Sequence, residues 1–475
     1  MKRYSPDFLL WLILFLPSFS SAAAIESLPP QMLVASDAFG GSLFGWQVDV
    51  DGDTAVISAF GDYEGKGAAY LFERSDSGWR EMAKLTASDG KKEDGLGISV
   101  AISDDTVILG AAGVDNDAGT DAGAVYVYVK PPDGWKSTTE TRKLDSPLPQ
   151  PGRGFGGTVA LVGDTLVVGA PGKDSAQSPG ALFIFQRQGS SWEHKATLEV
   201  SGLTGRDAFG ASLDFDGTTI VTGAFGRNDS RGEVYVYRKP AGGWLDGMEP
   251  EAVLQADDGA PKDYFGGSVA VDGDTIVVGA NRHDWDGKAK DAGAAYLFTR
   301  ASGNWSLRKK LGPHPKRPVG NFGYSVAVAG ERVVIGASHF RDQAADTVHI
   351  FDSAGGKWLE QGSLQNPDQP LDSKFGLSVA LGGDETTLAV GAPMADAGNE
   401  RWKMKAGSAY LIELKPPVIP DDEGPGTGGS EGGGSSDSGG GGGGGFSPLL
   451  LVLLLPPLLY RHAPLPGHCF RFRTS

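Results

Sequence analysis

The sequence contains a single cysteine, Cys469, close to its C-terminal end. A disulfide within the chain is therefore excluded, and so is a metal site built from several cysteines. No nucleophile-elbow, zincin or phosphate-loop signature is present, and the histidines share no position in the repeats described below. These absences count against catalysis, and we expect that the protein is not an enzyme.

Positive charge is also scarce. The 42 Lys and Arg residues are outnumbered by 59 Asp and Glu residues, which leaves a net charge of −17. Such an acidic chain repels a phosphate backbone, so we expect no nucleic-acid partner. What the chain has in abundance is glycine, with 72 residues, together with 29 prolines and 40% hydrophobic residues. Many turns and enough apolar material for a core predict a folded all-β protein.

Residues 1–24 have the order of a signal peptide. Lys2 and Arg3 precede an apolar run from Phe8 to Leu16, and a stretch of small residues ends at Ala24. The apolar run falls well short of the ~20 residues that span a bilayer, so cleavage after Ala24 and export are predicted. The alternative is a membrane anchor.

The composition changes again after residue 415. Residues 416–445 are rich in Gly and Ser and are expected to form a disordered linker, because they cannot bury enough apolar surface. Residues 446–475 begin with an apolar stretch, 446–460, and end with basic residues. This arrangement resembles the GlyGly-CTERM sorting signal of Gram-negative bacteria, which implies cleavage and delivery to the cell surface, although Pro456-Pro457 and the long basic tail depart from that pattern. The alternative is a permanent membrane anchor through residues 446–460.

Between these ends a sequence unit occurs seven times. It is clearest from Phe265 to Ala280, which read Phe-Gly-Gly-Ser-Val-Ala-Val-Asp-Gly-Asp-Thr-Ile-Val-Val-Gly-Ala. A repeat of this length is typical of propellers and solenoids. The equivalent copies start at Phe44, Leu96, Phe155, Phe209, Phe265, Phe322 and Phe375.

Each copy predicts four antiparallel strands, which we name A to D. The alternating residues from Ser268 and the β-branched run from Thr275 flank an Asp-Gly-Asp turn and predict a hairpin of strands A and B. Strand C follows a glycine such as Gly293, and strand D begins near a tryptophan and ends at a leucine. Seven such units predict a seven-bladed β-propeller of four-stranded blades over residues 25–415.

The last copy has no strand D after strand C. The missing strand is predicted at the other end of the chain, because Leu33 precedes Phe44 by 11 residues, as a leucine precedes every other copy. We therefore predict that the N-terminal strand joins the last blade and closes the ring, which leaves no open sheet edge between the first and last blades.

The paired Phe-Gly and Gly-Ala motifs, as at Phe155-Gly156 and Gly169-Ala170, resemble FG-GAP repeats. In integrin α-subunits such repeats build the N-terminal seven-bladed propeller, so the resemblance implies the same fold for residues 27–415 and, with the sorting signal, a bacterial member of the family. Integrin blades bind Ca²⁺ in a long loop between strands A and B. That site does not carry over, because the turn after Val271 is too short to surround an ion.

Repeat spacing separates scaffold from loops. Six tryptophans keep a constant distance from strand C and are predicted to pack between blades: Trp79, Trp135, Trp192, Trp244, Trp305 and Trp358. The interval between strands B and C varies from 8 to 15 residues. Because the B–C and D–A connections leave an antiparallel blade at the same end, we expect function at this end, called the B–C end below. In integrins it is the ligand-binding end.

Three consecutive B–C loops carry unusual side chains. The candidate ligand-binding residues are His283 and Trp285 in the fifth blade, His339, Phe340 and Arg341 in the sixth, and Trp402 in the seventh. Aromatic and Arg side chains on exposed loops suit contact with a protein or a glycan. The alternative is that they pack against neighbouring loops.

A possible calcium site lies in the second B–C loop. Asp115, Asp117 and Asp121 are alternating carboxylates, although the full spacing of a calcium loop is missing. Acidic residues in a solvated turn explain them equally well, so no cofactor is firmly predicted.

These observations predict an exported, monomeric binding or adhesion module that recognises an extracellular protein or glycan. The alternative is an exported hydrolase or lyase acting on polysaccharide, which requires carboxylates close together in the central channel. Strand A is dominated by Ser, Val, Ala and Gly, so a packed or inert channel is expected.

Overall fold

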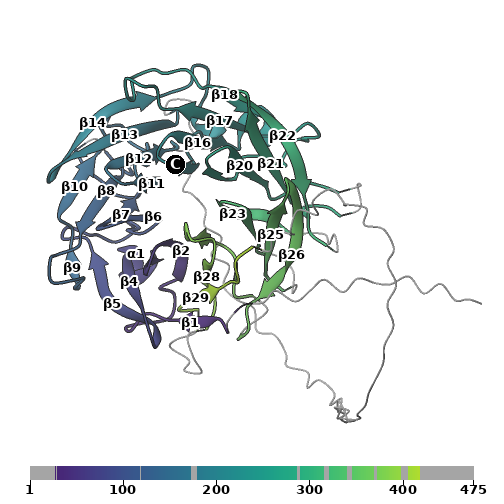
Figure 1. The fold of residues 1–475 in the computed structure, drawn as a ribbon. Coiled ribbons are helices and arrows are strands. Elements are labelled where there is room, and N and C mark those ends of the chain that lie inside the picture. Colours follow the sequence, from purple (N-terminus) through teal and green to yellow (C-terminus); the bar gives the residue numbers. More distant parts are fainter. Residues whose placement is uncertain are drawn as a thin grey trace, which may run out of the picture. The chain divides into compact units, whose positions relative to one another are not determined.

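The computed structural model describes residues 27, 29–117, 119–172, 179–285, 289–314, 320–339, 345–368, 372–396 and 405–417. Seven sheets, each with four antiparallel strands and one of them with a short fifth strand, are arranged around a common axis (Figure 1). The predicted seven-bladed β-propeller is thus confirmed. The predicted signal peptide, the sorting segment and all but the first two residues of the predicted linker lie outside the described residues.

The blades are numbered in chain order, and their strands run outward from the axis. Blade 1 has β2 (Phe44–Asp51), β3 (Thr54–Ala59), β4 (Ala68–Ser75) and β5 (Gly78–Thr86). Blade 2 has β6 (Ser99–Ser103), β7 (Thr106–Ala111), β8 (Ala124–Val129) and β10 (Arg142–Asp145). Blade 3 has β11 (Thr158–Val162), β12 (Thr165–Ala170), β13 (Ala181–Gln188) and β14 (Ser191–Leu198). Blade 4 has β15 (Ser212–Phe215), β16 (Thr219–Ala224), β17 (Glu233–Arg238) and β18 (Ala252–Leu254).

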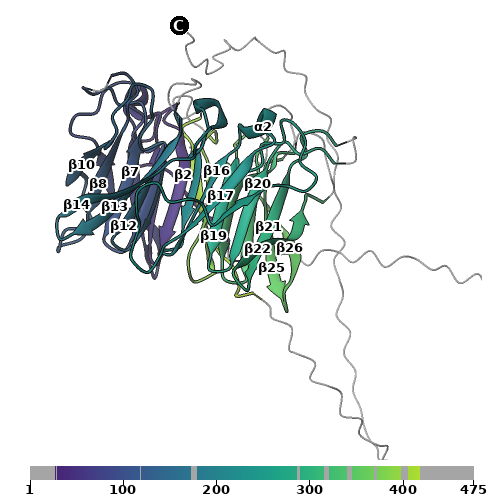
Figure 2. The same ribbon diagram turned by 90° about the horizontal axis from the view of Figure 1, so that it is seen from above.

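The remaining blades follow the same order. Blade 5 has β19 (Ser268–Asp272), β20 (Thr275–Ala280), β21 (Ala294–Ala301) and β22 (Asn304–Leu311). Blade 6 has β23 (Phe322–Ala329), β24 (Arg332–Ala337), β25 (Thr347–Ala354) and β26 (Lys357–Gln365). Blade 7 has β27 (Val379–Leu381), β28 (Thr387–Ala392), β29 (Ser408–Glu413) and β1 (Gln31–Leu33). The short helices α1 (Asp62–Gly65), η1 (Gly205–Asp207) and α2 (Arg227–Ser230) lie in the connections, α2 at the B–C end (Figure 2).

The outer strand of blade 7 comes from the N-terminal part of the chain. Strand β1 pairs antiparallel with β29, with Gln31 opposite Leu411 and Leu33 opposite Ala409. Leu33 is buried in the cluster that also holds Ala409 and Leu411. The N-terminal strand therefore supplies both backbone hydrogen bonds and core packing to the last blade.

The outer strands of blades 2 and 4 differ from the sequence-based expectation. In blades 1, 3, 5 and 6 strand D begins within a residue of the repeated tryptophan, but β10 and β18 begin seven or more residues after Trp135 and Trp244. Pro131 and Pro240 follow strand C in these two blades, and proline removes the N–H that a sheet ladder needs. The two strands D are correspondingly short, while β9 (Thr138–Thr139) pairs in parallel with β5 of blade 1.

The core consists of clusters between adjacent blades. One cluster, for example, packs Ile108 and Val125 of blade 2 against Leu166, Val168 and the buried Trp192 of blade 3. Five of the six repeated tryptophans are buried, and Trp305 is half-buried against such a cluster. The prediction that they are packing groups is confirmed.

Glycines of the two repeated motifs meet where blades touch. A Cβ on Gly223, the glycine of a Gly-Ala motif, would lie 2.0 Å from the carbonyl oxygen of Gly266, the glycine of the next Phe-Gly motif. The same approach of 2.0 Å joins Gly391 of blade 7 to Gly45 of blade 1. The two motifs recur because only glycine lets the backbones of neighbouring blades come this close.

Candidate functional site

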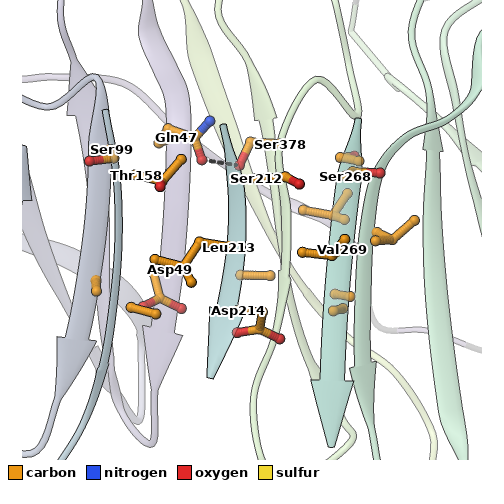
Figure 3. A pocket seen from close by; sticks show the side chains of 18 of the residues that line it. Gln47, Asp49, Ser99, Thr158, Ser212, Leu213, Asp214, Ser268, Val269 and Ser378 are labelled. Atoms are coloured by element: carbon orange, nitrogen blue, oxygen red, sulfur yellow. Dashed lines mark hydrogen bonds between the residues drawn. The ribbon is translucent and has the colours of Figure 1, made fainter. Parts of the chain in front are cut away.

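The strands nearest the axis line a central channel. It is a cavity of about 940 Å³ to which the strand-A segments of all seven blades contribute. Side chains at and near its wall include Gln47, Asp49, Ser212 and Asp214 (Figure 3). The channel is open and not packed, because small side chains on strand A leave the axis free; that it is inert stays a prediction.

A ring of hydroxyl groups connects the blades at one level of this channel. The Ser212 hydroxyl donates to the carbonyl oxygen of Gly266 in the next blade, and Ser99, Thr158, Ser268 and Ser325 make equivalent bonds of 2.7–2.9 Å. At the junction of blades 7 and 1 the Ser378 hydroxyl donates instead to Oε1 of Gln47 at 3.3 Å (Figure 3). These hydroxyls serve the scaffold, since each satisfies a carbonyl group between blades.

Two aspartates interrupt the otherwise small residues further along the channel. The carboxylate of Asp49 accepts the backbone N–H groups of Val50 and Ile102, each at 2.9 Å. Asp214 accepts those of Phe215 and Val271 at 2.8 and 2.7 Å. Each carboxylate therefore ties its own strand A to the strand A of the following blade.

These two carboxyl groups are half-exposed to the channel but lie deep within the molecule. Burial raises the pKa of Asp49 to about 7 and that of Asp214 to about 6, although the backbone N–H bonds oppose the rise. The sequence carried the signal for this pair, which was missed: the five other repeats have alanine at the same position, five residues after the repeat start.

Aromatic residues and one arginine gather where the channel opens at the B–C end. Phe225 follows β16, Tyr264 precedes the start of blade 5, Arg282 follows β20, and Tyr324 lies at the start of β23; all four line the channel cavity. We call these four residues the aromatic rim.

The members of the aromatic rim contact one another. The rings of Phe225 and Tyr264 meet edge to face with centroids 5.7 Å apart, and the Arg282 guanidinium lies over the Tyr264 ring at 4.9 Å. Burial raises the pKa of Tyr324, and the nearby positive charge of Arg282 opposes that rise. The three aromatic side chains are half-exposed and Arg282 is exposed. The rim was not predicted: Phe225, Tyr264 and Tyr324 lie at or next to the ends of strands and not in the long loops, and Arg282, although it lies in the fifth B–C loop, was not singled out there.

The backbone beside the rim is strained. Asn228, Asp229 and Ser230 are three consecutive non-glycine residues with φ between 54° and 60°, in the left-handed region. Their loop is held by Asn228, whose amide donates to the buried Glu233 at 2.9 Å, and by Ser230, whose carbonyl accepts the N–H of Tyr264 at 2.9 Å. Strain of this kind collects at functional sites, and here it positions Tyr264.

The candidate residues of the fifth B–C loop form a polar network. His283 is only 5% exposed, and its Nδ1 lies 2.8 Å from the carboxylate of Asp263. Trp285 is half-buried; its indole N–H donates to the carbonyl of Gly293 at 2.7 Å, and Lys310 lies over its ring at 4.3 Å. His283 and Trp285, the candidate residues that the structure describes in this loop, do not form an exposed patch, because these contacts turn both side chains toward the blade. Ligand binding by them stays a prediction.

The other candidate residues are divided between described and undescribed parts of the chain. His339 is 5% exposed, and its backbone N–H donates to the carboxylate of Asp346 at 2.7 Å. Its side chain is directed inward as well, with Nδ1 3.5 Å from the carboxylate of Asp346, which is fully buried. Phe340, Arg341 and Trp402 lie outside the described residues.

The three carboxylates proposed for calcium do not form a metal site in the described chain. Asp115 accepts the backbone N–H of Asp121 at 2.8 Å and so closes its own loop. Among the described residues, which include Asp115, Asp117 and Asp121, no three metal-ligating side chains of His, Cys, Asp or Glu are grouped closely enough to hold an ion. The turn interpretation accounts for Asp115.

A repeated tyrosine contact at the B–C end was also missed. Tyr296 of strand C donates to Asp258 of the preceding D–A connection at 2.7 Å, and Lys310 pairs with the same carboxylate. Burial tends to raise the pKa of Asp258, but the bonds from Lys310 and Tyr296 outweigh it and hold the pKa below its usual range. Equivalent sets are Tyr70, Asp37 and Lys84, and Tyr126, Asp89 and Lys143. The sequence signal was a Tyr, Asp and Lys at fixed repeat positions.

Comparison with protein families agrees with the repeated architecture. The model described as FG-GAP repeat matches residues 30–72, 79–128, 139–185, 192–237, 249–298 and 358–412, which is more than half of the chain. The chain belongs to the FG-GAP repeat family. Residues 299–357 of this FG-GAP protein fall between the matched ranges, yet β23, β24 and β25 build the same blade there.

Two integrin subunits are similar to part of the FG-GAP protein. Mouse integrin alpha-M is 30% identical over 226 residues, which cover 43% of this chain and 18% of the integrin. Human integrin alpha-X is 30% identical over 223 residues, covering 42% of this chain and 17% of the integrin. The matches thus span less than a fifth of the length of these relatives.

Solved structures show likeness in fold alone. U3-55K has a TM-score of 0.50 at 11% identity, covering 82% of this chain and 98% of that chain. The RRP9 WD40 repeats have a TM-score of 0.50 at 12% identity, covering 82% of this chain and 100% of that chain. No helix among the described residues is long and apolar enough to cross a membrane.

Proposed function

We propose that this FG-GAP protein is an exported binding module that recognises an extracellular protein or glycan through its B–C end, in adhesion at the surface of a Gram-negative bacterium. The similarity to integrin α-subunits supports a binding role. The observation that carries the proposal is the concentration of half-exposed aromatic side chains, an exposed arginine and strained backbone at the channel mouth. Rigid blades that present such groups are suited to recognition.

Export and surface delivery rest on the two ends of the sequence. The N-terminal basic, apolar and small-residue order supports a cleaved signal peptide, and the Gly-rich tract before residues 446–460 supports a sorting signal. Mass spectrometry of protein from the native host tests both. Mature protein that begins at residue 25 and lacks Cys469 is expected; mature protein that retains Cys469 contradicts the sorting signal and favours an anchor.

Binding is tested by screening the purified chain against arrays of extracellular glycans and proteins, with and without a chelator. Saturable binding by the parent chain is expected. Loss of binding in chelator would show that binding needs a metal ion such as calcium. If no glycan and no protein on the arrays binds saturably, the binding-module function is contradicted.

The second candidate function is a polysaccharide hydrolase or lyase. One observation favours it: Asp49 and Asp214 line the same channel, and burial raises the pKa of both carboxyl groups toward neutrality. Against it, both oxygens of each carboxylate accept backbone N–H groups, which is a structural use. Polysaccharide cleavage by the parent chain that disappears in both Asp49→Asn and Asp214→Asn would establish the enzyme.

A further inference from the structure

We propose that the aromatic rim binds the end of a neutral glycan, which enters the central channel from the B–C end. This inference rests on the proposed binding function and names its site and ligand class. The four residues of the rim come from three consecutive blades and line one cavity, so a single ligand can contact all of them.

Tyr264 combines an unfavourable backbone conformation with a ring at the channel mouth. It occupies the position before the repeat phenylalanine, where the backbone is left-handed in all seven blades, and its φ is 58°. Blades 2 and 3 place Gly95 and Gly154 at this position, whereas blades 1 and 7 also carry long side chains there, Leu43 and Lys374. A bulky side chain with positive φ costs free energy that glycine avoids. What distinguishes Tyr264 is that its half-exposed aromatic ring lines the channel mouth.

The chemistry of the cavity favours a sugar as the ligand. The half-exposed rings of Tyr264 and Tyr324 offer flat surfaces that pack against the apolar faces of pyranose rings. Asn281 and Arg282 at the same mouth supply planar groups that can hydrogen-bond pairs of sugar hydroxyls. Deeper in the channel the wall carries hydroxyls, Gln47 and the two carboxyl groups. Val, Leu and Ala side chains stand between these polar groups, and a wall that mixes the two suits a sugar, which has both hydroxyls and apolar ring faces.

The charge distribution favours a neutral glycan over a charged one. Among the residues that the structure describes, Arg282 is the one basic residue that lines the channel cavity, while Asp49, Asp214, Asp216 and Asp272 lie further along the channel. Together with the net charge of −17, these carboxylates disfavour a polyanionic chain. A cationic side chain would meet Arg282 before it reached them.

The binding experiment uses the purified chain and calorimetric titration with neutral cello-, chito-, malto- and manno-oligosaccharides. Polygalacturonate serves as the anionic probe and an oligo-arginine peptide as the cationic probe. Saturable binding of at least one neutral oligosaccharide is expected, with little effect of salt. Preferential binding of polygalacturonate or of the peptide overturns the neutral-glycan class but leaves the binding-module function standing. Binding of none of the probes also overturns the glycan class.

Variants locate the site. Tyr264→Gly relieves the left-handed strain and removes the ring, so the melting temperature should stay close to that of the parent while affinity falls at least about tenfold. Tyr264→Phe keeps the ring and should keep affinity within about threefold. Tyr324→Ala should also lose affinity. The control is Leu245→Ala, an exposed apolar residue in the C–D connection of blade 4, at the other end of the molecule.

The outcomes separate the site from the function. If the parent binds a neutral oligosaccharide and Tyr264→Gly binds it equally well, the rim is not the site, although the protein remains a glycan-binding module. If Leu245→Ala loses affinity as strongly as Tyr264→Gly, the loss is not specific to the rim and the proposal falls.

Discussion

At the scale of single residues, the repeated glycines stand where two blades come so close that no other residue type fits. Gly223 has no room for a Cβ because the Gly266 carbonyl of the next blade lies 2.0 Å from where that atom would be. The hydroxyl of Ser212 binds the same carbonyl oxygen at 2.7 Å. One carbonyl group thus organises the contact between two blades.

We expect Gly223→Ala to lower the free energy of unfolding by about 3 kcal/mol or more, because the blades must move apart to admit the methyl group. Denaturant unfolding measures this loss. The matched control is Gly242→Ala, which has open space around its Cβ and an ordinary φ and should change stability by less than about 1 kcal/mol. Equal stability of both variants would show that the blade contact relaxes freely.

Trp285 was predicted to be a surface anchor, but its contacts are those of a packing residue. We expect Trp285→Ala to cost about 2 kcal/mol of stability, since it removes the bond to Gly293 and uncovers the polar network of His283 and Lys310. Trp285→Phe keeps a ring but loses the N–H and should cost about 1 kcal/mol. Chemical unfolding of both variants tests this, and a Trp285→Ala protein as stable as the parent would restore the surface-anchor interpretation.

At the scale of elements, strand β1 combines two roles in three residues. Leu33 is 4% exposed and packs in the core of blade 7, whereas its neighbour Met32 is 41% exposed. The alternation is that of a strand with one face on the core. The same strand also covers the outer edge of β29, which would otherwise be open to another chain.

We expect Leu33→Ala to destabilise the propeller by about 2–4 kcal/mol, because a cavity opens in a cluster shared by blades 7 and 1. Met32→Ala in the same strand should stay within about 0.5 kcal/mol. Thermal unfolding of the two variants gives the comparison. Similar melting temperatures for both would mean that the N-terminal strand contributes little to closing the ring.

At the scale of the whole molecule, the two channel aspartates connect its stability to pH. Their pKa values are raised in the folded state, so protonation favours folding. The stabilisation that protonation provides is fully present below the pKa of an unfolded aspartate, near 4. It is lost as the pH rises through about 7 for Asp49 and about 6 for Asp214. The window of loss therefore extends from about pH 4 to slightly above neutrality.

We expect the free energy of unfolding of the parent to fall between pH 5 and pH 8, and to fall less in Asp49→Asn, which cannot ionise. Denaturant unfolding across this range provides the measurement. Asp76→Asn, at an exposed turn of blade 1, is the control and should follow the parent. If Asp49→Asn declines as steeply as the parent, Asp49 is already ionised in the folded protein at pH 5.

The sequence by itself determined the architecture of this protein. Seven copies of one motif predict seven blades of the same four-stranded plan, and the position of Leu33 predicts where the last strand comes from. These features follow from local backbone requirements, such as the glycines between blades, that repeat unchanged. Only the tertiary structure decided which single substitutions matter. Tyr264, Arg282 and Tyr324 are far apart in the chain and become neighbours because the ring brings the starts of the inner strands together at one mouth. His283 and Trp285 lie in a polar, variable loop, for which the sequence predicts exposed side chains. They turn inward because His283 bonds to the buried carboxylate of Asp263 and Lys310 lies over the ring of Trp285.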